Sequence, residues 1–293
     1  MPSSITHALV AQTAQTRLPE EINAIIKEAP EMYFLGAQGA DLFFFATKAN
    51  KQEGNLGKYL HRNSVYELFG AFLGVIRSLS GKTQRHAIAY CLGYVTHYCT
   101  DVAFHPCVYR YMEQNAKHKR EHQRIENDWD VYFARKLQHT EVENYPFPDL
   151  ERCDEEALLE VWKGATTTLG LTPMTKSRLR GGLCAFGAYL KFFHCECYSS
   201  QKGWAAFDKF FHAHLLSCLF PSKTPDQEII SGKAFERAAN PDEFITVRTV
   251  DDLFDRAVEE SVLRIGLFFD AVHGAPLSKT YFDCHLLTGE HLS

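Results

Sequence analysis

Three polar side chains occupy every fourth position of one apolar segment. His97, Asp101 and His105 lie in YVTHYCTDVAFHP, residues 94–106. A step of four residues along a helix turns the side-chain direction by only about 40°, so the three groups share one face. Imidazole and carboxylate groups gathered on one face suit Zn²⁺, and Fe²⁺ or Mn²⁺ are also possible. The spacing therefore indicates a metal site on a helix.

A second segment repeats the same spacing. Within HKREHQRIENDWD, residues 118–130, every fourth position carries a possible ligand: His118, His122, Glu126 and Asp130. Two such stripes on neighbouring helices can hold metal ions between them. A single buried histidine is more often a hydrogen-bonded core residue, and the second stripe could equally face solvent. The spacing alone leaves these interpretations open.

Helical periodicity dominates the chain, and no run of alternating strands bounded by tight turns is found. We expect helices at about 4–16, 19–28, 62–78, 83–104, 114–138, 154–169, 176–194, 200–218 and 251–272. Pro106 disfavours the helical conformation at His105, so we expect that helix to end there. The predicted fold is all-α, a single multi-helix domain over residues 1–293, with metal ligands in 1–130 and helices completing the bundle in 131–293.

Composition and charge limit the function. The formal net charge of −5 disfavours long nucleic acid as a partner, because binding phosphates needs clustered Lys and Arg. No apolar run reaches the roughly 20 residues of a membrane span. The first residues carry no secretory signal, so we expect a cytoplasmic protein without a transmembrane segment. The nine cysteines show no paired framework and are expected to be reduced. Nothing in the sequence predicts a partner protein.

Five segments form a wider pattern. They are SSITHALVAQ (3–12), GAQGADLFFF (36–45), YLHRNS (59–64), LGYVTHYCTDVAFHP (92–106) and EHQRIE (121–126). Over about the first 130 residues, and in the same order, they resemble the zinc-dependent phospholipase C family. That family is related to the fungal single-strand nucleases, which share a trinuclear zinc cluster. The resemblance implies two to three Zn²⁺ ions per chain, with other divalent metals possible.

The resemblance also implies which residues hold each ion. One zinc would take Asp41, His61, His97 and Asp101, and a second His105, His122 and Glu126. A third would take His7, a shared oxygen of Asp101, and the terminal nitrogen and carbonyl of Pro2 after the initial methionine is trimmed. His118 is a rival of His122, but only His122 has a carboxylate four residues later. The short offset from the chain start to His7 is that of the nuclease branch, and the four-residue gap from Asp101 to His105 is shorter than in classical members.

The implied function is metal-dependent phosphodiester hydrolysis. Water activated by metals about 3.5–4 Å apart would attack phosphorus in a phospholipid or a soluble phosphodiester, without a covalent intermediate. Asp41 is the candidate for orienting or deprotonating that water, although it could be a ligand or a turn residue only. Several aromatics near the ligand segments could line a pocket for a choline-like cation or stack a nucleobase, although such residues are more often core: Phe43, Phe44, Phe45, Tyr59 and Tyr66.

Two alternatives stay open. A nuclease or nucleotidase could use the same metal cluster. The short distance in sequence from the chain start to His7 favours this function, whereas the net negative charge of the chain disfavours long polynucleotides as substrates. Polynucleotide binding that weakens steeply as the salt concentration rises would indicate a nuclease. A non-catalytic helical protein could instead bind metal for structure alone, which predicts closed coordination without an open water position.

Overall fold

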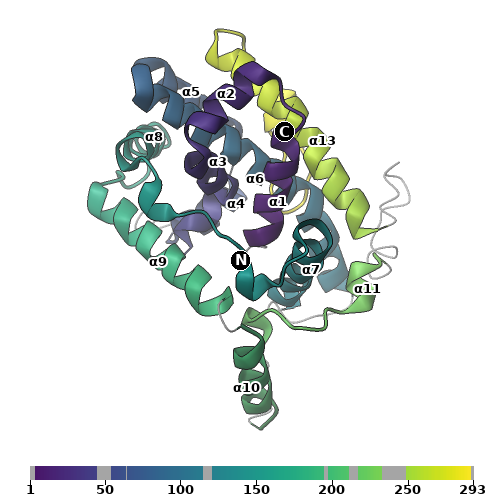
Figure 1. Ribbon diagram of the computed structural model, residues 1–293. Coiled ribbons are helices and arrows are strands. Elements are labelled where there is room, and N and C mark those ends of the chain that lie inside the picture. The colour runs from purple at the N-terminus through teal and green to yellow at the C-terminus, as the bar shows by residue number, and fades with distance from the viewer. Residues whose placement is uncertain are drawn as a thin grey trace.

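The computed structural model describes residues 4–44, 54–63, 65–114, 121–194, 197–210, 217–232 and 249–291 (Figure 1). Its helices are α1 Ser4–Gln15, α2 Glu20–Glu28, α3 Pro30–Ala37, α4 Leu56–Arg62, α5 Val65–Ser78, α6 Gly81–Gln114, α7 Glu121–Gln138, α8 Glu155–Thr168, α9 Lys176–His194, α10 Cys197–Phe210, α11 Gln227–Ile230, α13 Val250–Val272 and α14 Lys279–Phe282. Short 3-10 helices are η1 Gly39–Phe43, η2 Val142–Asn144, η3 Leu150–Arg152 and η4 Ser217–Leu219.

Within these ranges the secondary structure is helical, apart from isolated bridge residues, among them the pair Cys284 and His291. The all-α prediction is confirmed. No described helix combines the length and apolar character that a membrane span requires. The helix expected at 62–78 is α5, which begins at Val65. The preceding α4, which carries His61, was not predicted.

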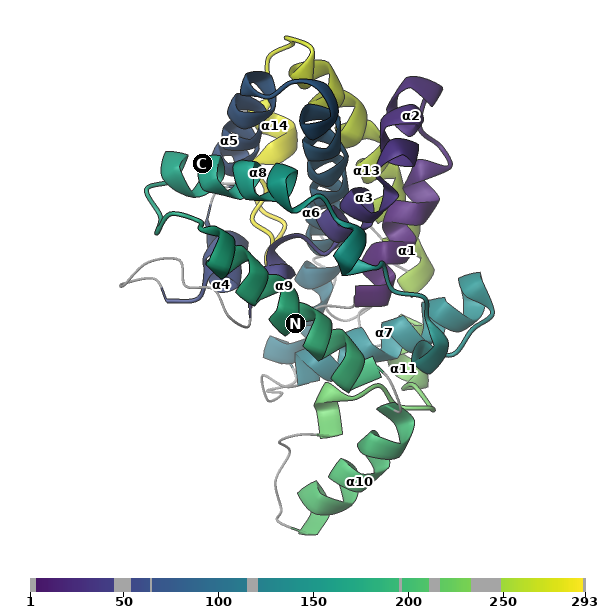
Figure 2. The same cartoon turned by 60° about the vertical axis from the view of Figure 1, so that its left-hand side comes forward.

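The longest helix, α6, lies at the centre of the bundle. It packs against α3, α13, α1 and α8 (Figure 2). Tyr90, Tyr94 and Tyr98 of α6 are fully buried and belong to an aromatic core that includes Phe69 and Phe72. A second hydrophobic cluster involves α1, α7 and α13. Residues such as Phe147, Phe193 and Val262 pack against both clusters. That residues 1–293 form one domain stays a prediction. Figure 2 also shows α10 extending away from the other helices.

The helix α6 does not end at His105, so that prediction was wrong. It continues through Pro106 to Gln114. Proline has no backbone N–H, so the Val102 carbonyl loses its usual helical donor. The backbone of Gly289 lies against this turn, where an added Cβ would be 3.0 Å from Pro106 Cγ and 3.5 Å from the Val102 oxygen. Tertiary packing around the turn overrides the local preference of the residue before proline.

Two glycines allow α3 and α6 to pack closely. A Cβ on Gly36 would lie 2.0 Å from the Tyr90 carbonyl oxygen, and one on Gly93 would lie 1.9 Å from the Tyr33 carbonyl oxygen. Both contacts are with backbone, so a larger residue at either position would push the helices apart. This close packing brings η1, which follows α3, next to the middle of α6.

Candidate metal centre

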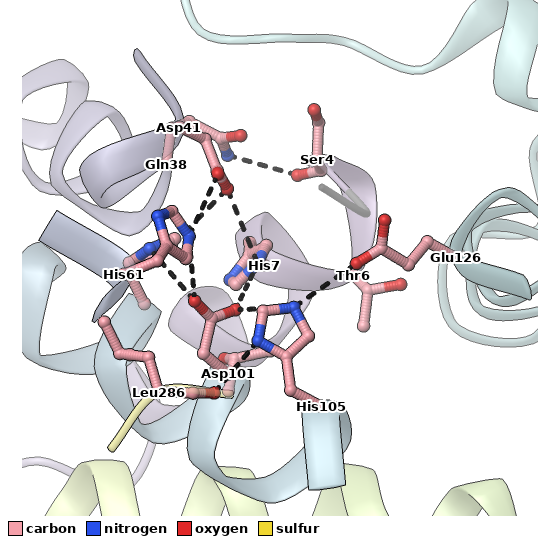
Figure 3. A network of polar contacts seen from close by, with 12 residues as sticks. Ser4, Thr6, His7, Gln38, Asp41, His61, Asp101, His105, Glu126 and Leu286 are labelled. Atoms are coloured by element: carbon pink, nitrogen blue, oxygen red, sulfur yellow. Dashed lines mark hydrogen bonds and ion pairs between the residues drawn. The ribbon is translucent and has the colours of Figure 1, made fainter. Parts of the chain in front are cut away.

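The carboxylate of Asp101 lies at the centre of a cluster of histidines (Figure 3). Its Oδ1 is 3.3 Å from Nε2 of His7 and 3.7 Å from Nε2 of His105. Its Oδ2 is 3.3 Å from Nε2 of both His61 and His97. Asp101 is only 2% exposed, so neighbouring side chains rather than water must compensate its charge.

Asp41 approaches the same histidines from η1. Its Oδ1 is 3.3 Å from His61 Nε2, and its Oδ2 is 3.8 Å from His97 Nδ1. This approach needs glycine at position 39, which has a φ of 49° and lies against the His97 ring. An added Cβ there would be 2.1 Å from His97 Cδ2. The glycine of the GAQGAD segment therefore allows Asp41 and His97 to meet.

The side chain of Asn55 fixes α4 beside η1. Its Oδ1 accepts the Lys58 backbone N–H at 3.1 Å and so caps the helix, while its Nδ2 donates to the Phe44 carbonyl at 2.5 Å. Gly57 completes the contact, since a Cβ there would lie 2.9 Å from the Ala40 carbonyl oxygen. These contacts place His61, one turn after Gly57, beside Asp41.

A further group of candidate ligands lies between α6 and α7. His122 Nε2 is 2.8 Å from Glu126 Oε1, and His105 Nε2 is 3.5 Å from the same oxygen. The two imidazole rings are 5.2 Å apart. His118, the sequence alternative to His122, and Pro2, the proposed terminal ligand, lie outside the described residues.

Backbone carbonyls orient two of the histidines. His61 Nδ1 lies 2.7 Å from the Gly57 carbonyl oxygen, and His105 Nδ1 lies 3.0 Å from that of Leu286. A carbonyl only accepts hydrogen bonds, so each Nδ1 carries a proton, and each Nε2 is directed toward the carboxylates, where it could bind a metal ion. Leu286 is 181 residues from His105, and no feature of the sequence indicated this contact.

Asp130 does not face the candidate ligands, although it continues the second stripe. Its Oδ1 accepts hydrogen bonds from the backbone N–H and hydroxyl of Thr6, each at 2.8 Å, and its Oδ2 accepts the Ile5 N–H at 3.2 Å. Next to the end of α3, Gln38 Nε2 donates to the Ser4 carbonyl at 3.1 Å (Figure 3). Two segments distant in sequence therefore hold the start of α1, which places His7 against Asp101.

Burial and charge shift the titration of these groups in opposite directions. Burial lowers the pKa of His61, but close contacts with Asp101 and Asp41 and the negative charge of both carboxylates outweigh it and raise that pKa to about 10. At His97 burial prevails and lowers the pKa to about 4. Burial opposes ionisation of Asp101, yet the nearby histidines, including His105 and His97, hold its pKa well below the ordinary value. The pair of carboxylates thus favours a positive charge between them.

The donor atoms fit zinc. Among the described residues, three groups have ligand atoms that all lie within 4.8 Å of one another: His7, His97 and Asp101; Asp41, His61 and His97; and His105, His122 and Glu126. Both ring nitrogens of His97 and the Oδ2 atoms of Asp41 and Asp101 are buried without a hydrogen-bond partner in the described chain. Such atoms are costly to bury, and a bound cation would satisfy them. Imidazole nitrogens and carboxylate oxygens are the donors that zinc prefers alongside thiolates.

A pocket of about 440 Å³ opens onto these groups. Candidate ligands on its wall are Asp41, His61, His105, His122 and Glu126, and the other lining residues are Phe44, Lys58, Arg62, Tyr109, Met112, Gln123, Leu219 and Leu287.

Of the aromatics considered from the sequence, Phe44 lines this pocket. Phe43 is instead fully buried against Trp162, and Tyr59 and Tyr66 pack on the core. Phe45 lies outside the described residues. The sequence analysis missed Tyr109, which follows His105 by four residues and therefore shares its helix face. That spacing could have indicated it.

Comparison with known proteins gives one match. A family model described as zinc dependent phospholipase C matches residues 6–168. The matched region runs from α1 to the end of α8 and contains every described residue of the three ligand groups. No curated protein and no solved structure gave a significant match.

Proposed function

Because the chain belongs to the zinc-dependent phospholipase C family, we propose that it hydrolyses phosphodiesters in the manner of a phospholipase C. The observation that carries the proposal is the pocket, since five of the candidate ligands line its wall. A purely structural metal site would be closed, whereas a catalytic one keeps a position open to water and substrate. An open wall of ligands favours catalysis over the non-catalytic alternative.

We assign the candidate ligands to the ions as follows. One ion would be held by Asp41, His61, His97 and Asp101, a second by His105, His122 and Glu126, and a third by His7, Asp101 and the terminal Pro2. When bound, zinc supplies Lewis acidity, which makes water a better nucleophile near neutral pH and stabilises negative charge on phosphate and leaving-group oxygens.

In this proposal Asp41 takes the proton from the attacking water. The Asp41 side chain lines the pocket, which places its carboxylate beside the substrate. The water oxygen forms a bond to phosphorus, the bond from phosphorus to the alcohol oxygen breaks, and the departing alkoxide takes up a proton from solvent. His97 is fully buried and does not line the pocket, so its role is to hold metal and not to touch substrate.

Metal content and turnover test the proposal together. Protein with its native amino terminus is loaded with zinc, and its zinc content is measured by mass spectrometry. We then measure the hydrolysis of bis-p-nitrophenyl phosphate and of a short-chain phosphatidylglycerol. We expect two to three zinc ions per chain and turnover of both substrates. A chain that takes up no zinc, or that takes up zinc but cleaves no phosphodiester, would overturn it.

Matched histidine variants sharpen the test. His61→Gln removes a candidate ligand, whereas His86→Gln removes a buried histidine that pairs with a different carboxylate, Asp154, at 2.9 Å. We expect His61→Gln to lose zinc and turnover, and His86→Gln to retain its zinc. A nuclease would be recognised by steep loss of polynucleotide binding with salt.

A further inference from the structure

Two cationic side chains lie on the pocket wall in addition to the candidate ligands. Lys58 and Arg62 are both exposed and line the pocket. They lie four residues apart on α4, so they share one helix face. Among the described residues that line the pocket, Lys58 and Arg62 are the only charged side chains that are not candidate ligands. No described carboxylate forms an ion pair with either side chain.

This charge does not suit a cationic head group. A quaternary ammonium is held by aromatic faces, and Phe44 and Tyr109 do offer two rings. The carboxylates on the wall, Asp41 and Glu126, belong to the candidate ligand groups and would be neutralised by metal. The ammonium would then meet Lys58 and Arg62 without a compensating acid, and like charges brought together oppose binding.

The same charge suits an anion beyond the phosphate that is cleaved. A phosphodiester carries a single negative charge, which the metal ions would balance. Arg62 presents a planar fork of N–H donors that matches phosphate or carboxylate, and Lys58 adds a mobile point charge. The pocket volume of about 440 Å³ lies within the range for small-ligand sites, so it suits a head group rather than a whole lipid.

We propose that the substrate carries a second anionic group, a phosphate or carboxylate, on the part that lies against α4, and that Lys58 and Arg62 select for it. This inference rests on the proposed function, because the pocket is the same site. It narrows the substrate class from phosphodiesters in general to those with an additional acidic group.

Three short-chain phospholipids with identical acyl chains test the inference on the zinc-loaded protein. Their head groups are choline, glycerol and glycerol phosphate, and kcat/KM is measured for each. We expect glycerol phosphate to exceed glycerol by about tenfold, as for two partly exposed ion pairs, and choline to be the poorest. The preference should shrink as ionic strength rises, because exposed charges are screened. Equal values, or a preference for choline, would overturn the inference.

Matched variants assign the selectivity to α4. Lys58→Gln/Arg62→Gln removes the two pocket cations, and Arg17→Gln/Lys82→Gln removes two exposed cations that do not line the pocket. We expect the kcat/KM ratio of glycerol phosphate to glycerol to fall to within about twofold of unity in the first double variant. The second should keep the ratio of the parent protein. A ratio unaffected by the α4 double variant would refute the assignment.

Binding separates this inference from the proposed function. If the protein cleaves no phosphodiester, the proposed function is refuted. Calorimetry with glycerophosphoglycerol and its phosphorylated form still measures the binding selectivity for a second anionic group. About tenfold tighter binding of the phosphorylated probe, lost in the α4 double variant, would support the inference, and equal binding would overturn it. Dithymidine monophosphate with and without a 5′-phosphate is the second arm. Selectivity confined to that pair would identify the second anion as a neighbouring nucleotide phosphate rather than a head group.

Discussion

Replacing Asp130 by asparagine is expected to destabilise the fold and also to weaken zinc binding through His7. Asp130 accepts three hydrogen bonds from the first turn of α1 and is 1% exposed. Hydrogen bonds to a charged acceptor contribute about 1.5–3 kcal/mol, against about 1 kcal/mol for a neutral one. Asparagine keeps one carbonyl oxygen, but its amide would turn a donor toward the N–H of Ile5 and leave that group unpaired.

These contributions combine to a loss of about 3 kcal/mol in the free energy of unfolding, with a smaller part from the helix dipole. His7 lies one turn after Ser4, so an α1 with a loosened start no longer holds His7 Nε2 beside Asp101 Oδ1. Zinc affinity should fall together with stability, although Asp130 belongs to none of the ligand groups found among the described residues.

Asp252 provides the matched control. It also serves a helix start, because its Oδ2 accepts the Thr249 backbone N–H at 2.7 Å in the capping box of α13, but it is exposed. Asp252→Asn should cost about 1 kcal/mol or less and leave zinc affinity unchanged. Urea unfolding in the presence of a chelator gives the stability of each variant, and competition with a chromophoric chelator gives zinc affinity. The reasoning would be refuted if Asp130→Asn unfolded at the same urea concentration as the parent. Lower stability with unaltered zinc affinity would show that Asp130 holds α1 without positioning His7.

Three further outcomes are expected. Gly39→Ala should lower both the melting temperature and the zinc content, because a φ of 49° is strained for alanine and the added methyl group would clash with His97. Gly74→Ala, inside α5 with open space around it, should change neither quantity. Equal effects of the two variants would contradict the argument. Burial raises the pKa of Asp128 to about 7, although the Asp226 N–H and Arg124 oppose the shift. The folded state therefore binds this proton more tightly than the unfolded chain, so the stabilisation is complete below about pH 4 and is lost as pH rises to about 7, by roughly 4 kcal/mol at most. The difference in urea stability between parent and Asp128→Asn should follow that window, and a difference independent of pH would exclude the shift. Chelation of zinc should lower the melting temperature, and the decrease should be larger when the reference sample contains more zinc. A ligand at about 1,000 times its Kd adds roughly 4 kcal/mol to the free energy of unfolding. An unchanged melting curve would argue against metal binding.

Much of the candidate site was predictable because it is written in local spacing. His97, Asp101 and His105 share a helix face whatever else the chain does, and the structure places all three around one cluster. The same holds for His122 and Glu126, which are one turn apart on α7. The order of short segments indicated the family, and the family match confirms it.

Local spacing by itself determined which side chains share a face, because the helical repeat is a property of the backbone. It could not determine what each face meets. Asp130 follows the same periodic stripe as Glu126 but holds the start of α1, because α1 packs against α7 at that position. Likewise, α6 passes through Pro106, and Leu286 orients His105 from the far end of the chain. Packing between segments far apart in sequence decided these contacts, and with them the charge that Lys58 and Arg62 present to the pocket.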